Sequence, residues 1–366
     1  MMFIIDRYIF KIWLGNFVLV LGFLLGLFFC HQVYDNLVDL LRLERSLIQL
    51  FHFFSISLVI LTPMLIPLSF FISILFTILG FQKSAQLTVL KSCGLSLFRI
   101  SRSLWFVSVI LSIIVFFLSL FLIPNLVEQK NNLMIGISQS DISALVDTGK
   151  TELLSYENFH ENRIWYIEDF SPDKYVGAYT ILHQMDSKGS ELNRIIAKNS
   201  FYDKDLKTWV FIEGTELFFD PVSGDPLRSV KFKHKQFLEL KEDPKDFLLF
   251  NRKLSSLSFY QLKELIDLIP KNLEFRRTYL IEYYGFFIAP FLSIIFVGIS
   301  IPFLSKGIYG NSLIGLFYAT AGMVLFFITQ GVFQVLGQQA LISPLLAVLL
   351  PYIIFAVFSL KLYWQE

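Results

Sequence analysis

Six long apolar stretches constrain the fold of this sequence more than any other feature. A helix that crosses a hydrocarbon core of about 30 Å needs about 20 mostly apolar residues. Six windows satisfy this requirement, and none has a Lys or Arg in its apolar middle: residues 12–34, 52–81, 103–126, 279–304, 311–337 and 343–362. The sequence therefore predicts an α-helical polytopic membrane protein, with three spans before and three spans after a long polar segment.

Composition excludes several functional classes. Charged residues make up 17% of the chain, against about 25% in average soluble proteins. The net charge of +1 gives no basic field for nucleic acid. The sequence has no Gly-x-x-x-x-Gly-Lys-Ser/Thr nucleotide loop and no catalytic cluster, so we expect no enzymatic activity and no cofactor. Cys30 and Cys93 lack neighbouring metal ligands, and we expect them to be buried, unpaired and metal-free.

Lys and Arg residues near the ends of the spans predict the orientation, because cytoplasmic flanks are enriched in them. With the N-terminus inside, the cytoplasmic flanks contain Arg7, Lys11, Lys83, Lys91, Arg99, Arg102, Lys306 and Lys361. The outer flanks contain Arg42 and Arg45, since a segment as long as 128–277 does not count in this rule. We therefore expect both termini in the cytoplasm and segment 128–277 outside it.

The polar segment 128–277 has the pattern of a β domain. Short stretches rich in β-branched and aromatic residues alternate with turns that contain Gly, Pro and Asp. The predicted strands are Arg163–Phe170, Tyr175–Gln184, Arg194–Tyr202, Trp209–Phe219 and Ser229–Leu240. Their regular spacing is typical of a sandwich or a jelly roll. A helix is predicted over Ser258–Ile269, with Ser258 as its N-cap.

Polar side chains within the spans are few. Glu282 lies in the first turn of the fourth span, and Gln330 and Gln334 lie one helical turn apart on the fifth. Hydrogen bonding between helices is the favoured role of the two glutamines, ahead of a substrate contact. Pro63 and Pro67 predict a kink in the second span, because each removes a backbone hydrogen bond.

The connection between the second and third spans predicts a short helix over about 84–98. Leu87, Leu90 and Lys91 fall at i, i+3 and i+4, and Gly94 is a natural helix stop. An amphipathic element of this kind docks in a groove of a soluble partner or rests on lipid headgroups. The periodicity alone does not separate these two interpretations.

The outer end of the first span is the other polar cluster. It runs from His31 to Asn36 and is followed by Arg42 and Arg45. Arginines at this level can bind lipid phosphates through forked hydrogen bonds. Ordinary anchoring at the membrane interface explains the same pattern equally well.

These segments resemble the LptF/LptG (YjgP/YjgQ) family of lipopolysaccharide-export permeases, and the LptG branch more than the LptF branch. The resemblance is carried by four short motifs: Ile5-Asp6-Arg7-Tyr8-Ile9, the segment Ala85–Ser96, Ile123-Pro124-Asn125, and Glu282 eight positions before Pro290. It implies six spans split around a periplasmic β-jellyroll domain, with segments 1–127, 128–277 and 278–366. It also implies a location in the inner membrane of a Gram-negative-type bacterium.

The resemblance implies a mechanism and a set of partners. A sibling permease would complete a heterodimer, and a cytoplasmic ABC ATPase dimer would supply the energy. A small bitopic membrane partner and a periplasmic bridge protein would receive lipopolysaccharide extracted from the membrane lipid. The residues implied for ATPase coupling are Gln86, Leu87, Val89, Leu90, Lys91, Cys93, Gly94 and Leu95, and those implied for substrate binding are Gln32, Arg42, Arg45 and Glu282.

Two of these positions depart from the pattern of the family. The family usually has a Glu at the position of Gln86, where it pairs with an Arg of the ATPase, and often a Lys at the position of Gln32. A neutral hydrogen bond would then replace an ion pair at Gln86. The alternative function is a membrane scaffold that signals to periplasmic partners without moving lipid.

Overall fold

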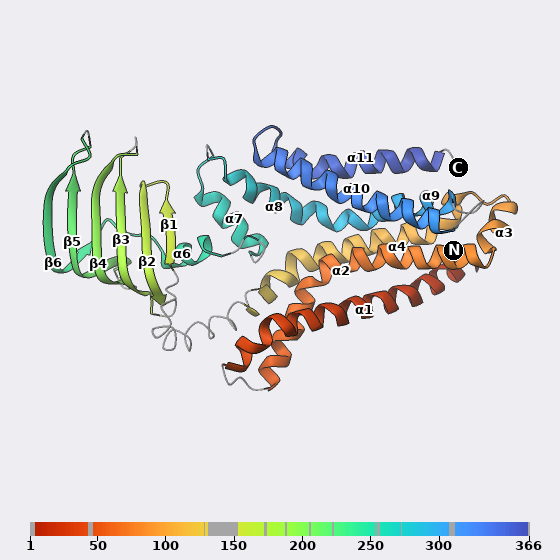
Figure 1. Ribbon diagram of the computed structural model, residues 1–366, viewed down its shortest axis with the longest axis horizontal. Coiled ribbons are helices and arrows are strands. Elements are labelled where there is room, and N and C mark those ends of the chain that lie inside the picture. The colour runs from red at the N-terminus through yellow and green to blue at the C-terminus, as the bar shows by residue number, and fades with distance from the viewer. Residues whose placement is uncertain are drawn as a thin grey trace. The chain divides into compact units, whose positions relative to one another are not determined.

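The chain divides into two compact units in the computed structural model (Figure 1). The helical unit comprises Met1–Asn131 and Leu273–Glu366, and the β unit comprises Asn132–Asn272. The structure describes residues 4–42, 47–127, 129–130, 153–171, 174–186, 189–204, 206–221, 223–252, 254, 257–271, 273–306 and 312–364.

Six helices among the described residues are long and apolar enough to cross a membrane, which confirms the predicted spans. The helical segments are α1 (Ile4–Arg42), α2 (Leu47–Lys83), α4 (Leu97–Phe117) with the π-helical turn η1 (Leu118–Leu122), α8 (Arg276–Ile288) with the 3-10 turn η3 (Ala289–Phe291) and α9 (Leu292–Lys306), α10 (Ser312–Gln338) and α11 (Pro344–Trp364). The fourth span changes to a 3-10 turn at Pro290, which has no N–H to donate. Pro63 and Pro67 lie inside a continuous α2.

The main core of the helical unit joins α1, α2, α4, α9 and α10. Its largest members include Trp13, Phe70, Phe71 and Phe296. Hydroxyl groups fasten α1 to α2: the Trp13 indole N–H donates to the Ser73 Oγ over 2.8 Å. Small hydroxyl residues suit this role because they let helix backbones approach while they accept hydrogen bonds inside the membrane.

The β unit is built on one antiparallel sheet in which each strand pairs with the next along the chain (Figure 1). The strands are β1 (Leu153–Asn158), β2 (Arg163–Ser171), β3 (Val176–Met185), β4 (Glu191–Asp203), β5 (Thr208–Phe219) and β6 (Pro226–Phe237). The antiparallel β domain inserted between the third and fourth spans is therefore confirmed. The described strands form one sheet. Strand β1 was not predicted.

One face of this sheet carries an aromatic core. Trp165 of β2, Trp209 and Phe211 of β5, and Phe247 of the short helix α6 (Pro244–Phe250) are completely buried. Helix α7 (Phe259–Leu268) has Ser258 as its N-cap. The Ser258 hydroxyl accepts a hydrogen bond from the Gln261 backbone N–H, and the Gln261 side-chain oxygen accepts one from the Ser258 backbone N–H. This capping box confirms the helix start predicted from the sequence.

Candidate functional site

A cavity of about 440 Å³ lies within the helical unit among the spans. Its wall is formed by α2, α4 with η1, α8, η3, α9, α10 and α11. Most of the lining is apolar, with Met64, Phe286 and Phe327 as its larger members. The cavity has the size and the apolar character of a site for a small ligand or for part of a larger one.

Prolines and irregular helical turns line this cavity. Pro63 and Pro67 from α2, Pro290 from the 3-10 turn, and Ser119 from the π-helical turn all line it. Prolines and π-helical turns are common causes of helix kinks, and π-helical turns are frequent at functional sites. Non-helical backbone at membrane depth is tolerated where it is buried in protein or lines a cavity.

Four polar side chains reach this cavity. They are Ser119, Glu282, Gln330 and Tyr352. An ionisable residue inside a membrane span is costly and usually marks a functional site. The structure thus places Glu282, which the sequence singled out, on the wall of the cavity. Gln330 lines it as well, whereas Gln334 is not among the lining residues.

The other residues expected to bind substrate lie at the outer end of α1. The Gln32 side-chain oxygen accepts from the Asn36 amide over 3.3 Å. His31 pairs with Asp35 at 3.1 Å, so this polar cluster is largely engaged along its own helix. Arg42 is the last residue of α1, and its side chain lies outside what the structure describes, as does all of Arg45. Of the two members of the predicted set whose side chains the structure describes, Glu282 lines the cavity and Gln32 does not.

The connection between α2 and α4 contains a helix shorter than predicted. Helix α3 covers Gln86–Ser92, and Cys93 is its C-cap. Gly94 has a φ of 78°, and the N–H groups of Gly94 and Leu95 donate to the carbonyls of Lys91 and Leu90. This pair of bonds is a Schellman motif, which ends a helix. The range 84–98 is therefore corrected to α3, a turn, and the start of α4 at Leu97.

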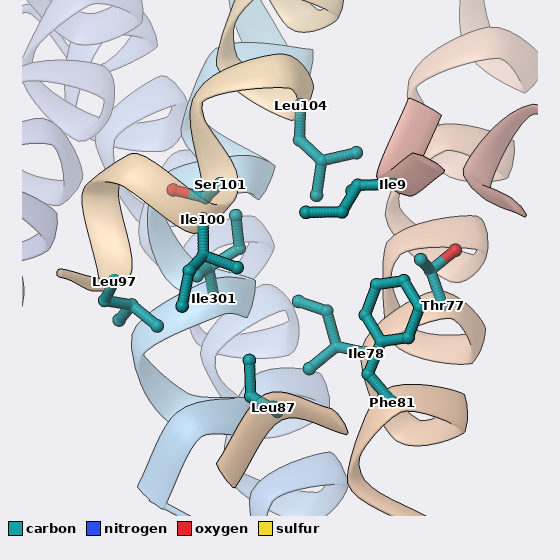
Figure 2. Close-up of a pocket in the computed structure, with 10 residues that line it drawn as sticks. All are labelled: Ile9, Thr77, Ile78, Phe81, Leu87, Leu97, Ile100, Ser101, Leu104 and Ile301. Carbon is teal, nitrogen blue, oxygen red and sulfur yellow. The ribbon is translucent and has the colours of Figure 1, made fainter. Parts of the chain in front are cut away.

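The predicted apolar face of α3 is turned into the protein. Leu87 is only 3% exposed and lies among apolar side chains of the helical unit (Figure 2). Leu90, Lys91 and Leu95 are half-buried, while Val89 is 60% exposed. The Gln86 side-chain oxygen accepts a hydrogen bond from the Tyr8 hydroxyl over 3.2 Å. The surface that α3 offers is thus centred on Val89.

Both cysteines differ from the expectation that they are buried. Cys30 and Cys93 are free and exposed. Cys93 lies in the turn after α3, and Cys30 lies on an outward face of α1 that an apolar side chain can occupy in a membrane. Burial was predicted from the small apolar character of cysteine alone. This prediction was wrong because the sequence does not show which face of a span is turned to lipid.

The sequence did not reveal the cavity, because its lining comes from positions spread between Pro63 and Tyr352. Two weak signals were present: the prolines within spans and the single acidic residue in the fourth span.

Comparison with curated proteins returned no match. The family described as "Lipopolysaccharide export system permease LptF/LptG" matches residues 7–365, which includes both units. This chain belongs to the LptF/LptG family of lipopolysaccharide export permeases, and it is a multi-pass protein of the inner membrane.

Proposed function

We propose that this chain is the permease subunit through which an ABC ATPase extracts lipopolysaccharide from the inner membrane. The observation that carries the proposal is the apolar cavity among the spans of a chain that matches the permease family over residues 7–365. The acyl chains of the substrate would enter this cavity. The lipid would then pass to the β unit and on to a bridge protein for delivery to the outer membrane.

Apolar burial is the interaction that such a substrate offers. Each buried CH₂ group contributes about 0.8 kcal/mol, so a lipid with many acyl chains leaves the bilayer only if another apolar surface or an energy source compensates. A cavity of about 440 Å³ accepts only part of such a lipid. The remainder needs a second apolar wall, which supports a heterodimer with a sibling permease.

Glu282 and Gln330 would orient the polar part of the substrate. A carboxylate accepts hydrogen bonds and repels phosphates, so Glu282 suits sugar hydroxyls or amide N–H groups. Phosphate binding would fall to cations at the outer end of α1, where we propose Arg42 and Arg45, with Gln32 as a neutral neighbour. This arrangement requires the N-terminus in the cytoplasm and the β unit in the periplasm, which is the orientation that we propose.

Energy would arrive through α3. The half-buried Gln86 and the exposed Val89 are the residues that we propose for contact with the ATPase dimer. Leu90 packs against the core of the helical unit, so Val89 is the sharper position for a test. Changing Val89 to Asp is expected to abolish co-purification with the ATPase while the chain still folds. We also propose the LptG branch and a small bitopic membrane partner.

Photocrosslinking from the cavity tests the substrate proposal. A photoreactive residue at Met64, which is 64% exposed and lines the cavity, should give lipopolysaccharide adducts. The matched control is Phe106, which is 60% exposed on α4 and lies outside the cavity lining. ATP and the ATPase should reduce the Met64 adduct. Equal adducts at both positions would contradict the proposal, and protein adducts alone would favour the scaffold function.

A further inference from the structure

Leu87 is the only buried residue of α3, a helix that the structure describes throughout. Its side chain enters a socket formed by four spans (Figure 2). The socket, named here the Leu87 socket, includes Ile9 of α1, Ile78 and Phe81 of α2, Ile100 of α4 and Ile301 of α9. One buried side chain of this short helix therefore shares a small cavity with side chains from four membrane spans.

The Leu87 socket is almost filled. The space left beside the side chain is about 20 Å³ and is lined by apolar atoms. A volume of this size is comparable with one water molecule, and an apolar cavity of this kind stays dry. Close-packed interiors have low compressibility and transmit strain. A displacement of α3 would therefore act on the side chains that surround the socket.

The ends of α3 restrict how it can move. A helix of seven residues is not stable by itself, so its position depends on its attachments. Ala85 at the N-terminal end has a φ of 55° and Gly94 at the other end a φ of 78°. The side chain of Gln82, just before α3, donates to the Leu304 carbonyl of α9. Beside the Tyr8–Gln86 hydrogen bond and the half-buried Leu90, Leu87 is the fully buried contact through which movement of α3 reaches the bundle.

Three of the four spans that form the socket also line the substrate cavity. Helices α2, α4 and α9 contribute residues to both. Within α2, Phe81 lies at the socket and Pro67 at the cavity. Within α9, Ile301 lies at the socket and Phe296 at the cavity. Spatial continuity of this kind is consistent with coupling and calls for a direct test.

We propose that Leu87 is the positioning residue that transmits displacement of α3 to α2, α4 and α9, separately from the surface of α3 that binds the ATPase. The inference rests on the proposed function, since it assumes an ATPase that moves α3. It assigns two tasks to two faces of one helix. Val89 on the exposed face serves binding, and Leu87 on the buried face serves transmission.

The test uses the complex of this chain, its sibling permease and the ATPase, reconstituted in proteoliposomes that contain lipopolysaccharide. Leu87→Ala should leave ATPase affinity unchanged and lower the lipid released per ATP hydrolysed by about tenfold, a coupling effect within the range known for residues between sites. Leu87→Met should restore the ratio because it conserves side-chain volume. If Leu87→Ala does not fold, Leu87→Val takes its place. It should lower the lipid released per ATP hydrolysed by less than tenfold.

The matched control is Leu65→Ala, which removes an equally buried leucine of α2 that lines neither the socket nor the cavity. It should lower stability without changing lipid released per ATP. Wild-type release per ATP in Leu87→Ala and Leu87→Val would overturn the inference, and so would a loss of ATPase affinity in these variants equal to that of Val89→Asp. If the wild-type complex neither binds an ATPase nor releases lipid, the proposed function itself fails.

Discussion

The two units of this protein distribute polarity in opposite ways. In the β unit, Trp165, Trp209 and Phe211 are fully buried, and most of the charged residues that the structure describes are exposed or partly exposed. In the helical unit, Phe23 and Phe317 are more than 60% exposed, whereas Ser69 and Ser73 are completely buried. The exterior of each unit is therefore suited to a different solvent. Lipid accepts the apolar exterior, so close packing and internal hydrogen bonds must hold the spans together.

The largest expected effect breaks the aromatic core of the β unit. Trp209 is fully buried, lies 5.1 Å from the Trp165 ring, and donates its indole N–H to the Glu242 carbonyl over 3.0 Å. Trp209→Ala should lower the free energy of unfolding of this unit by about 3–5 kcal/mol. Urea unfolding, followed by near-ultraviolet circular dichroism, measures it. Trp364→Ala is the control, since Trp364 is 93% exposed, and equal losses in both variants would contradict the interpretation.

A matched pair of exposed leucines tests whether the two exteriors face different solvents. Leu325 of α10 is 56% exposed, and Leu206 in the turn between β4 and β5 is 59% exposed. Leu325→Lys should cost about 2.5–3.5 kcal/mol, because a charge near the middle of a span is disfavoured by that amount on the insertion scale. Leu206→Lys should change stability by less than about 0.5 kcal/mol.

Membrane insertion and refolding yield from bilayers measure the effect on Leu325, and urea unfolding measures that on Leu206. Comparable effects at both positions would mean that α10 is not turned toward lipid.

The sequence predicted the spans because the length and hydropathy of a span depend on local composition. It predicted five strands for a related reason, because apolar and polar residues alternate along the strands of a sheet that buries one face. Strand β1 escaped because its residues Ser155, Glu157 and Asn158 resemble a loop, and pairing with β2 decides its structure. The long-range contact with the neighbouring strand was not visible in the local pattern.

The candidate site was less predictable than the fold. Glu282 was identified because a charge in a span is rare, but the cavity depends on the packing of five spans. For α3, the periodicity identified the apolar face, but it did not show what this face packs against. The structure turns Leu87 inward, because the tight turns at Ala85 and Gly94 set the angle at which α3 leaves its neighbours. Such angles follow from tertiary contacts.

A smaller effect concerns the pH dependence of the β unit. Burial, together with the nearby Asp243 and Glu264, raises the pKa of Asp246 to about 6 from its ordinary value of 3.8. The folded state then holds a proton that the unfolded state releases, so stability falls as pH rises from about 4 to about 6 and is level above that. Asp246→Asn removes this loss. Because the carboxylate is only half-buried, the gain above pH 6 should be about 1 kcal/mol.

Urea unfolding of wild type and Asp246→Asn at a series of pH values measures this gain. The difference between the two proteins should shrink as pH falls below about 6 and vanish near pH 4. A difference that stays constant over this range would contradict the role assigned to Asp246.

The smallest expected effect compares one buried hydrogen bond in each unit. In the helical unit, Trp13 donates to Ser73 over 2.8 Å, and in the β unit the hydroxyls of Thr180 and Ser200 share a bond of 2.7 Å. Double-mutant cycles should give a coupling energy of about 0.6 kcal/mol for the first pair and about 1 kcal/mol for the second. The membrane pair is weaker because its unfolded state in lipid still finds hydrogen-bond partners.

The variants for these cycles are Trp13→Phe with Ser73→Ala, and Thr180→Val with Ser200→Ala. Each preserves most of the side-chain volume, so packing changes largely cancel in the cycle. Unfolding in detergent measures the first pair and urea unfolding the second. A coupling energy of several kcal/mol between Trp13 and Ser73 would show that hydrogen bonds, rather than close packing, hold α1 against α2. The helical unit would then rely on polar contacts more strongly than the β unit does.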